Sequence, residues 1–183
     1  MEYESFAALV APHTATMARV AAALVGTGDA EDAAQEALLR AWQGWLSLRD
    51  AGAVHTWLLR ITVNVCRNWQ MGHFGTTRRR NAPLDLAANL ATLAAHGDVP
   101  DDADSLDLRR AVLALPDDLR RVVALRFYAG MDSTQIGSAL DAPAATIRTR
   151  LRRALELLRR DLQEKDADEI HTSPLPREGI SHD

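Results

Sequence analysis

Apolar side chains recur along most of the chain three or four residues apart, the spacing that places them on one face of an α-helix. In the first part of the sequence this pattern covers Phe6–Val25, a stretch from Asp29 to about Trp45, and His55–Gln70. The polar GTGD segment at 26–29 separates the first two, and Asp29 is the predicted N-cap of the second. We therefore expect a small all-helical domain at the N-terminus.

A different composition separates this domain from a second one. The intervening residues mix alanine and leucine with prolines, glycines and the acidic run DVPDDAD, which is typical of a linker with room for one short helix. Helical periodicity then resumes from Leu106 and stops after Gln163. We expect an all-α fold of two small domains joined by a flexible linker. The predicted boundaries are 1–76, 77–105 for the linker, 106–163, and 164–183 for a disordered acidic tail.

The second domain carries the local signals of a helix-turn-helix. Proline and acids in Leu115–Asp118 predict a helix start, and that helix runs to a left-handed C-cap at Gly130. Asp132 and Gln135 have the spacing of a capping box that opens a short helix. The turn at Asp141–Pro143 then leads into a long helix. A short helix, a tight turn and a longer helix are typical of DNA-binding domains.

Charge changes this picture locally. The chain holds 21 basic and 25 acidic residues, yet Asp141–Arg160 carries six arginines and one glutamate after its opening aspartate. Stepping 100° per residue, Ile147, Leu151 and the later leucines share one side of this helix. Small polar residues followed by arginines share the other side, as a helix in the major groove requires. The alternative is a solvated basic face on a packing helix.

Other classes of function find little support in the composition. The single cysteine, Cys66, excludes an internal disulfide and is typical of a reducing compartment. The histidines are scattered, and no nucleophile–base pair or phosphate loop is present, so we expect no enzyme, catalytic residue, metal site or cofactor. His13 and Arg19 in the N-terminal apolar stretch argue against membrane insertion. We expect a cytoplasmic protein.

Two helices of the first domain have unusual polar faces. Leu39 lies among acids and an amide, which suggests a protein contact surface, although a single exposed leucine is the common alternative. On His55–Gln70, Trp57 lies among arginines and asparagines. Aromatic rings and cations together suit single-stranded nucleic acid. Packing of Trp57 against a neighbouring helix is the alternative, and the sequence leaves both open.

Three segments carry a family resemblance. LPDDLRRVVALRFYAGMDSTQIGSALDAPAATIRTRLRRALELLRR closely resembles the C-terminal domain of bacterial sigma factors of the extracytoplasmic-function group, which reads the −35 promoter element. DAEDAAQEALLRAW resembles the sigma-family helix that docks on the β′ coiled coil of RNA polymerase. HTWLLRITVNVCRNWQ resembles the helix that recognises and opens the −10 element. Together the resemblances cover about residues 4–76 and 106–163. The chain departs from the usual family residues at Gln135, Gly137, Asp141 and Ala145, so the resemblance does not specify the promoter sequence.

The resemblance implies a non-catalytic sigma factor that binds promoter DNA and core RNA polymerase, through its β′ coiled coil and β subunit. An anti-sigma factor is a further candidate partner. The implied polymerase-binding residues are Asp29, Asp32, Gln35, Glu36, Leu39 and Arg40. The implied −10 contacts are Trp57, Arg60, Asn64, Arg67 and Asn68. The implied −35 contacts are Arg126, Ser133, Thr134, Ala145, Thr146, Arg148, Thr149, Arg150, Arg152 and Arg153.

Two rival functions remain at this point. A stand-alone helix-turn-helix regulator would bind a specific duplex site without polymerase, usually a two-fold symmetric one. A helical adaptor would use the Leu39 face to bind a protein, and would keep its function after Arg152→Ala and Arg153→Ala.

Overall fold

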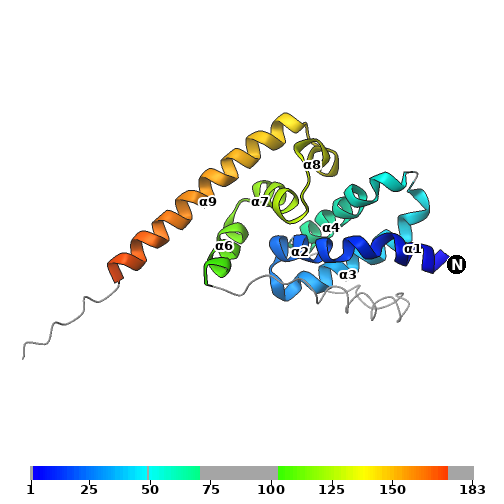
Figure 1. Ribbon diagram of the computed structural model, residues 1–183, viewed down its shortest axis with the longest axis horizontal. Helices are drawn as coiled ribbons and strands as arrows, with labels where there is room; N and C mark the ends of the chain where they lie inside the picture. Colours follow the sequence, from blue (N-terminus) through cyan, green and yellow to red (C-terminus); the bar gives the residue numbers. More distant parts are fainter. Residues whose placement is uncertain (1, 49, 71–102, 173–183) are drawn as a thin grey trace, which may run out of the picture.

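The structure is a computed structural model that describes residues 2–48, 50–70 and 103–172, with side chains described over 5–48, 50, 52–70 and 107–164. Figure 1 shows an arrangement of helices alone, and no strand occurs in these ranges, which confirms the all-α fold class. The long helices are α1 (Glu2–Val10), α2 (Thr14–Val25), α3 (Thr27–Gly44), α4 (Val54–Gln70), α6 (Ala103–Ala114), α7 (Asp117–Val123), α8 (Ser133–Leu140) and α9 (Ala144–Thr172). Short helical turns are η1 (Ala11–His13), η2 (Trp45–Ser47), η3 (Ala51–Ala53) and the π-helical turn η4 (Ala124–Tyr128).

The N-terminal apolar stretch is not one continuous helix as its periodicity predicts. Pro12 in η1 has no backbone N–H for a helical hydrogen bond, so α1 ends and α2 starts afresh at Thr14. The Thr14 hydroxyl donates to the Ala11 carbonyl at 3.0 Å and supports this break. By length and composition alone, Ser5–Val25 is long and apolar enough to cross a membrane, with a mean hydropathy of 1.3. A buried core helix meets the same measures, and Met17 and Val20 are fully buried here.

The predicted N-cap at Asp29 is wrong. Gly26 separates α2 from α3 with a φ of 86°, and its N–H closes α2 on the Ala22 carbonyl at 3.0 Å. A positive φ is accessible to glycine without steric cost, so the chain reverses at this one residue. Helix α3 therefore begins at Thr27. Asp29 lies in its first turn, where its negative charge interacts favourably with the positive end of the helix dipole.

Helices α2, α3 and α4 pack against one another and form the N-terminal unit. Its fully buried side chains include Phe6, Met17 and Leu58. The Phe6 ring meets Trp42 edge to face, with ring centroids 5.2 Å apart. The helix predicted over His55–Gln70 is confirmed as α4, so the β-branched ITVNV segment folds as a helix.

The C-terminal unit contains the expected helix-turn-helix, α8 and α9. The capping box is confirmed: the Asp132 carboxylate accepts from the backbone N–H of Thr134 at 2.7 Å and of Gln135 at 2.8 Å. The Gln135 side chain in turn accepts from the Asp132 N–H at 2.9 Å. Asp141 closes α8 in the left-handed conformation, with a φ of 58°. Before α8, Gly130 has the predicted left-handed φ, 68°.

Two helices of this unit extend past the boundaries that the sequence pattern predicts. Helix α9 continues to Thr172, whereas the sequence pattern predicts disorder from Glu164. No proline or glycine occurs between Pro143 and Pro174, so each added residue extends an existing helix, and Arg160 pairs with Glu164 at 3.3 Å. Helix α6 already begins at Ala103, inside the predicted linker of 77–105. The rest of that linker, 77–102, and residues 173–183 lie outside the described residues.

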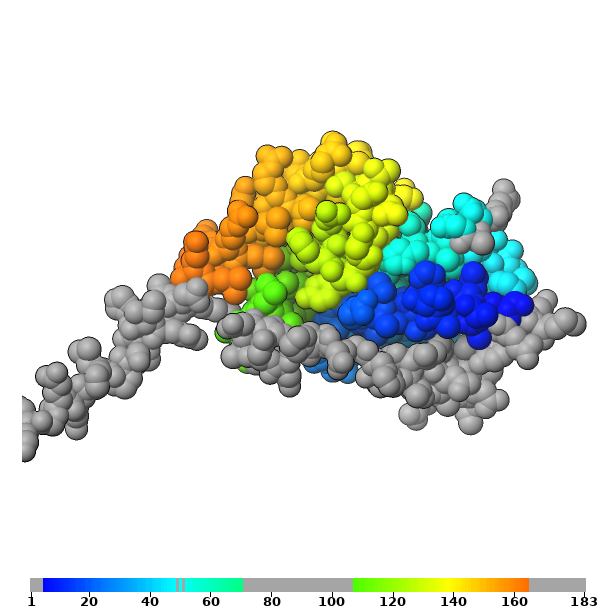
Figure 2. All heavy atoms as spheres, in the orientation of Figure 1, coloured from blue at the N-terminus to red at the C-terminus, as the bar shows by residue number. Residues whose placement is uncertain are grey.

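The two units pack directly against each other. Figure 2 shows the C-terminal unit seated on α2, and α4 lies against α8 in Figure 1. One apolar cluster continues across this contact and includes Ile136 and Ala139 of α8. An ion pair lies at the same contact, with Arg60 Nη2 3.8 Å from Asp141 Oδ2.

Candidate nucleic-acid interface

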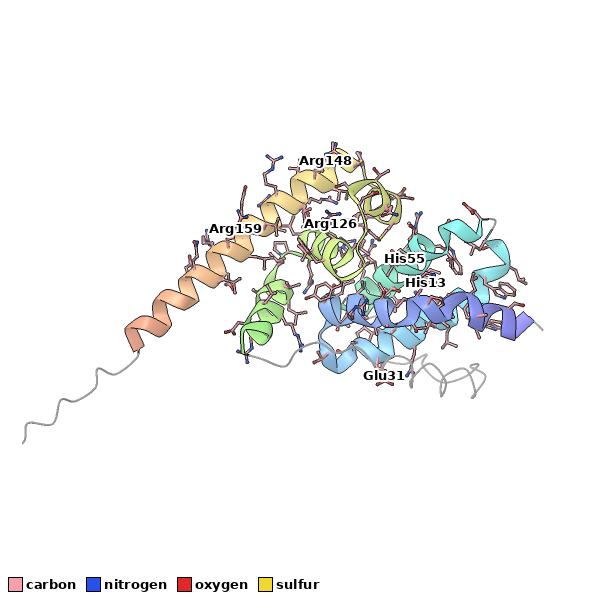
Figure 3. The ribbon with its side chains drawn as sticks, in the orientation of Figure 1. His13, Glu31, His55, Arg126, Arg148 and Arg159 are labelled. Carbon is pink, nitrogen blue, oxygen red and sulfur yellow. The ribbon has the colours of Figure 1, made fainter. Side chains whose placement is uncertain are left out.

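Helix α9 has the two faces that its sequence predicts. On the inner face Ile147 and Ala154 are fully buried, and Leu158 is nearly so. The outer face at the N-terminal end carries small residues and then cations that project into solvent: Ala145, Arg148, Thr149, Arg152 and Arg153 are all exposed. Thr146 is half-buried. Figure 3 shows Arg148 at the end of α9 next to α8, and Arg159 much further along the same helix.

Helix α8 packs against α9 and leads into its N-terminal end. Thr134 is exposed and Ser133 is half-buried, both in the first turn fixed by the capping box. Arg126, in η4, is an exposed residue whose Nη1 donates to the Met131 carbonyl at 3.1 Å. This bond orients Arg126 toward the turn that leads into α8, so its remaining N–H groups lie near that turn.

Arg150 differs from the other arginines of α9. It is half-buried, and its Nε lies 3.4 Å from Asp118 Oδ2 at the start of α7. This ion pair links the side of α9 to the start of α7. The sequence groups Arg150 with the candidate −35 contacts, but a helical step of 100° alone does not show that a carboxylate on another helix lies within reach.

Gly137 of α8 permits the tight approach of the turn that follows. A Cβ built at this position would lie 2.5 Å from the Ala142 carbonyl oxygen, closer than real Cβ atoms come to another atom. The backbone crosses here because the Ala142 N–H also donates to the Gly137 carbonyl at 2.9 Å. Glycine, one of the departures from the family pattern, therefore suits the turn in which Asp141 is left-handed.

The candidate −10 face of α4 is partly exposed. Arg60, Asn64 and Arg67 are exposed, while Asn68 and Trp57 are half-buried. A Cβ on Gly44, at the end of α3, would lie 3.7 Å from the Trp57 ring, so this ring has a packing neighbour and also an accessible part. Trp57 therefore packs against α3, and its contact with nucleic acid stays a prediction.

Helix α4 buries more of its surface than its sequence pattern indicates. Apolar spacing along this helix predicts that Leu58, Ile61, Val65 and Trp69 are buried, with Cys66 beside them. Leu58, Val65 and Cys66 are buried, but Ile61 and Trp69 are only half-buried. Further around the helix, the unexpected core residues are Leu59, Thr62 and Val63. They are buried because α4 packs on α8 as well as on α2 and α3. The four-residue spacing of Leu59 and Val63 was the available signal for this second apolar face.

Side chains on the candidate polymerase-binding face of α3 form a hydrogen bond and an ion pair with other side chains of the same helix. The Gln35 amide donates to Glu31 at 3.1 Å, and Arg40 pairs with Glu36 at 3.1 Å. Asp29 is exposed and Asp32 is half-buried. Leu39 is half-buried against the core, so it is less accessible than its polar neighbours suggest. In Figure 3 Glu31 lies at the edge of the molecule away from Arg148, so this face and the outer face of α9 point to different sides.

Metal-ligating side chains do not gather in the part of the chain that the structure describes. Among the described residues, no group of three or more His, Cys, Asp or Glu side chains gathers as a metal site would require. Burial raises the pKa of the Cys66 thiol to about 12, so the thiol stays protonated at neutral pH.

Comparison with known proteins identifies the two units. The family model "Sigma-70 region 2" matches residues 9–72, and the model "Sigma-70, region 4" matches 105–158. These matches fall on α2–α4 and on α6–α9, in the chain order that the resemblance predicts.

Individual relatives agree with this assignment. The ECF RNA polymerase sigma-E factor of Escherichia coli K12 is 28% identical over 169 residues, 88% of each chain. The probable RNA polymerase sigma factor RfaY of Xanthomonas campestris is 36% identical over 143 residues, and the chain spans only 34% of that relative.

Two solved structures share the fold. CnrH in complex with the cytosolic domain of CnrY has a TM-score of 0.61 at 22% identity, covering 88% of this chain and 90% of CnrH. The sigma factor RpoE of Bartonella quintana, in complex with the anti-sigma factor NepR, has the same TM-score at 20% identity, covering 88% and 96%. With both regions present in order, the chain belongs to the sigma-70 family of RNA polymerase sigma factors, in the extracytoplasmic-function group.

Proposed function

We propose that this sigma factor binds core RNA polymerase and directs it to promoters by placing its two helical units on two DNA elements. The observation that carries the proposal is the outer face of α9, where small residues precede exposed arginines directly after a capped α8 and a left-handed turn. Small side chains let the helix approach base edges, and the arginines behind them reach guanine or phosphate. We assign the −35 duplex to this face.

We assign the −10 element to α4 and the residues that follow it. The exposed Arg60, Asn64 and Arg67 offer cations and amides to the backbone and bases of an opened strand. The accessible part of Trp57 offers a stacking surface, and stacking contributes about 1–3 kcal/mol per base. The protein performs no covalent step in this scheme, because the chemistry belongs to the polymerase.

We assign core polymerase binding to the acidic face of α3, around Asp32–Arg40. This face lies away from the outer face of α9, so one protein can contact the enzyme and DNA together. The family relation suggests the β′ coiled coil as its main partner, with the β subunit near the C-terminal unit. It also suggests an anti-sigma factor as a regulator and the cytoplasm as the location.

The proposal is tested by transcription in vitro with purified core RNA polymerase on genomic promoter fragments, with and without the protein. Defined transcripts that appear only with the protein are expected. The double variant Arg152→Ala/Arg153→Ala should lose most of them at −35-dependent promoters. Arg159→Ala, an exposed arginine further along α9, is the matched control and should transcribe like the wild type.

Other results separate the rivals. Tight, specific duplex binding by the protein alone, with neither polymerase association nor transcripts, would establish the stand-alone regulator. Polymerase association and full activity in the double variant would instead favour the adaptor, because the outer face of α9 would then be dispensable.

A further inference from the structure

Two neighbouring histidines lie where the two helical units meet, and one of them bonds across the contact. His13 ends η1 and His55 lies in the first turn of α4, both in the N-terminal unit, whereas Ala129 precedes α8 in the C-terminal unit. The two Nδ1 atoms lie 3.3 Å apart, and His55 Nε2 lies 3.3 Å from the Ala129 carbonyl oxygen. The imidazole rings are 5.2 Å apart and tilted by 51°. Figure 3 labels the two histidines next to each other in the N-terminal unit, where α2 and α4 meet.

The hydrogen-bond roles follow from the carbonyl. A carbonyl oxygen only accepts, so His55 Nε2 carries a hydrogen and donates it to Ala129. If His55 is neutral, its Nδ1 has a lone pair and accepts from the Nδ1–H of His13. If His55 is protonated, its Nδ1 donates instead and His13 Nδ1 accepts. The hydrogen bond between the two Nδ1 atoms can therefore form when the pair of histidines carries no added proton and also when it carries one.

A second proton removes this arrangement. With both imidazoles charged, each Nδ1 carries a hydrogen and neither has a lone pair for the other. Two positive charges then face each other in a partly buried place, where their repulsion is screened less than in water. The rings must separate, and the bond from His55 to Ala129 depends on the position of the same ring.

The neighbouring helices supply charges that have partners of their own. The pKa of His13 is lowered, first by burial and then by the charge of His55. Tyr128 in η4 is neutral at physiological pH, because the ordinary pKa of tyrosine is about 10 and burial raises it further. Four charged groups on η4, α4, α2 and α3 have partners: Arg126 bonds the Met131 carbonyl, Arg60 pairs with Asp141, Arg19 bonds Thr16, and Glu36 pairs with Arg40.

The packed arrangement cannot be the promoter-bound one under the proposed function. Elements at −10 and −35 are 25 base pairs apart, which is about 85 Å of duplex at 3.4 Å per pair. In the structure α4 lies directly against α8. The contact between the units must therefore open before both elements are bound, and any group that holds this contact influences the opening.

We propose that the bond from His55 to Ala129 is an acid-released latch between the two helical units, closed while the pair of histidines carries at most one added proton and opened by the second. Burial favours the neutral form of His13, so the contact is at full strength above pH 6.5, the ordinary pKa of histidine. It weakens as the pH falls below that value through the lowered pKa of His13.

The test is small-angle X-ray scattering of the full chain at pH 7.5 and pH 5.5, with circular dichroism to follow helix content. For the wild type we expect a larger radius of gyration at pH 5.5 with unchanged helix content. The variant His13→Asn/His55→Gln keeps amide donors near the two positions but cannot be protonated, so its radius should not change. His171→Asn, a histidine near the end of α9, is the matched control and should expand like the wild type.

An unchanged wild-type radius would overturn the latch, and so would equal expansion of the double variant. If the double variant does not fold, the ring nitrogens of the wild type are titrated by nuclear magnetic resonance. Coupled titration of His13 and His55 supports the latch, and two independent titrations near pH 6.5 overturn it. Neither measurement uses polymerase or DNA, so failure of the latch leaves the proposed function standing, and failure of transcription leaves the latch testable.

Discussion

Arg150 on α9 and Asp118 on α7 form an ion pair, with Arg150 Nε 3.4 Å from Asp118 Oδ2. The two side chains are 35% and 46% exposed, so solvent screening limits the pair to at most about 1 kcal/mol of stability. Its larger consequence is orientation, because it holds one guanidinium of α9 beside α7. The neighbouring Arg152 and Arg153 remain on the outer face.

The first prediction compares these arginines. Arg152→Ala should weaken binding of a −35 duplex. Loss of one phosphate contact should also make the plot of log affinity against log salt concentration shallower, by a slope of roughly 0.9. Arg150→Ala should change both much less, because Asp118 already holds its side chain. Fluorescence anisotropy over a range of salt concentrations measures both quantities. Equal losses for the two variants would show that Arg150 leaves Asp118 to bind DNA.

The second prediction concerns Gly137. Gly137→Ala should destabilise the helix-turn-helix by about 1–3 kcal/mol, because its Cβ meets the Ala142 carbonyl oxygen and a backbone atom cannot move aside cheaply. Gly28→Ala is the matched control: it lies in α3 with no atom within 4 Å of the added Cβ, and should stabilise by about 0.5–1 kcal/mol. Urea unfolding followed by circular dichroism gives both values. A neutral Gly137→Ala would mean that the turn relaxes.

The third prediction concerns the capping box of α8. Asp132→Ala removes the acceptor for two backbone N–H groups, and should cost about 0.5–2 kcal/mol of unfolding free energy. Thr134→Ala serves as the control, since Thr134 contributes its backbone N–H to the cap and its side chain is exposed. Its effect should stay within about 0.5 kcal/mol. Thermal unfolding ranks the two variants, and equal losses would argue that the cap adds no stability.

The fourth prediction concerns the thiol. Because burial raises the pKa of Cys66 to about 12, the native protein at pH 8 should present almost no thiolate and react very slowly with a thiol reagent. The same protein in denaturing urea should react at the rate of a free cysteine. Absorbance of the released chromophore follows both reactions. Rapid reaction of the folded protein would reveal frequent local opening of α4.

Local signals allowed much of this structure to be predicted from the sequence. The capping box at Asp132, the left-handed Gly130 and the two faces of α9 each depend on residues within a few positions of one another. In three places the structure departs from the local prediction: Pro12 breaks the first helix, Gly26 rather than Asp29 precedes α3, and α9 runs on to Thr172. In these cases a backbone restriction, or its absence, outweighed the side-chain pattern.

The sequence by itself therefore determined the helices, their order, the family and the candidate faces. Tertiary structure alone decided that α4 is buried on a second side, that Asp118 holds Arg150, and that His55 reaches the Ala129 carbonyl. The physical reason is the range of the interactions. Helical hydrogen bonds and caps join residues up to four apart, so short patterns encode them. Contacts between helices join residues far apart in the chain, and only the packing of whole faces brings those side chains together.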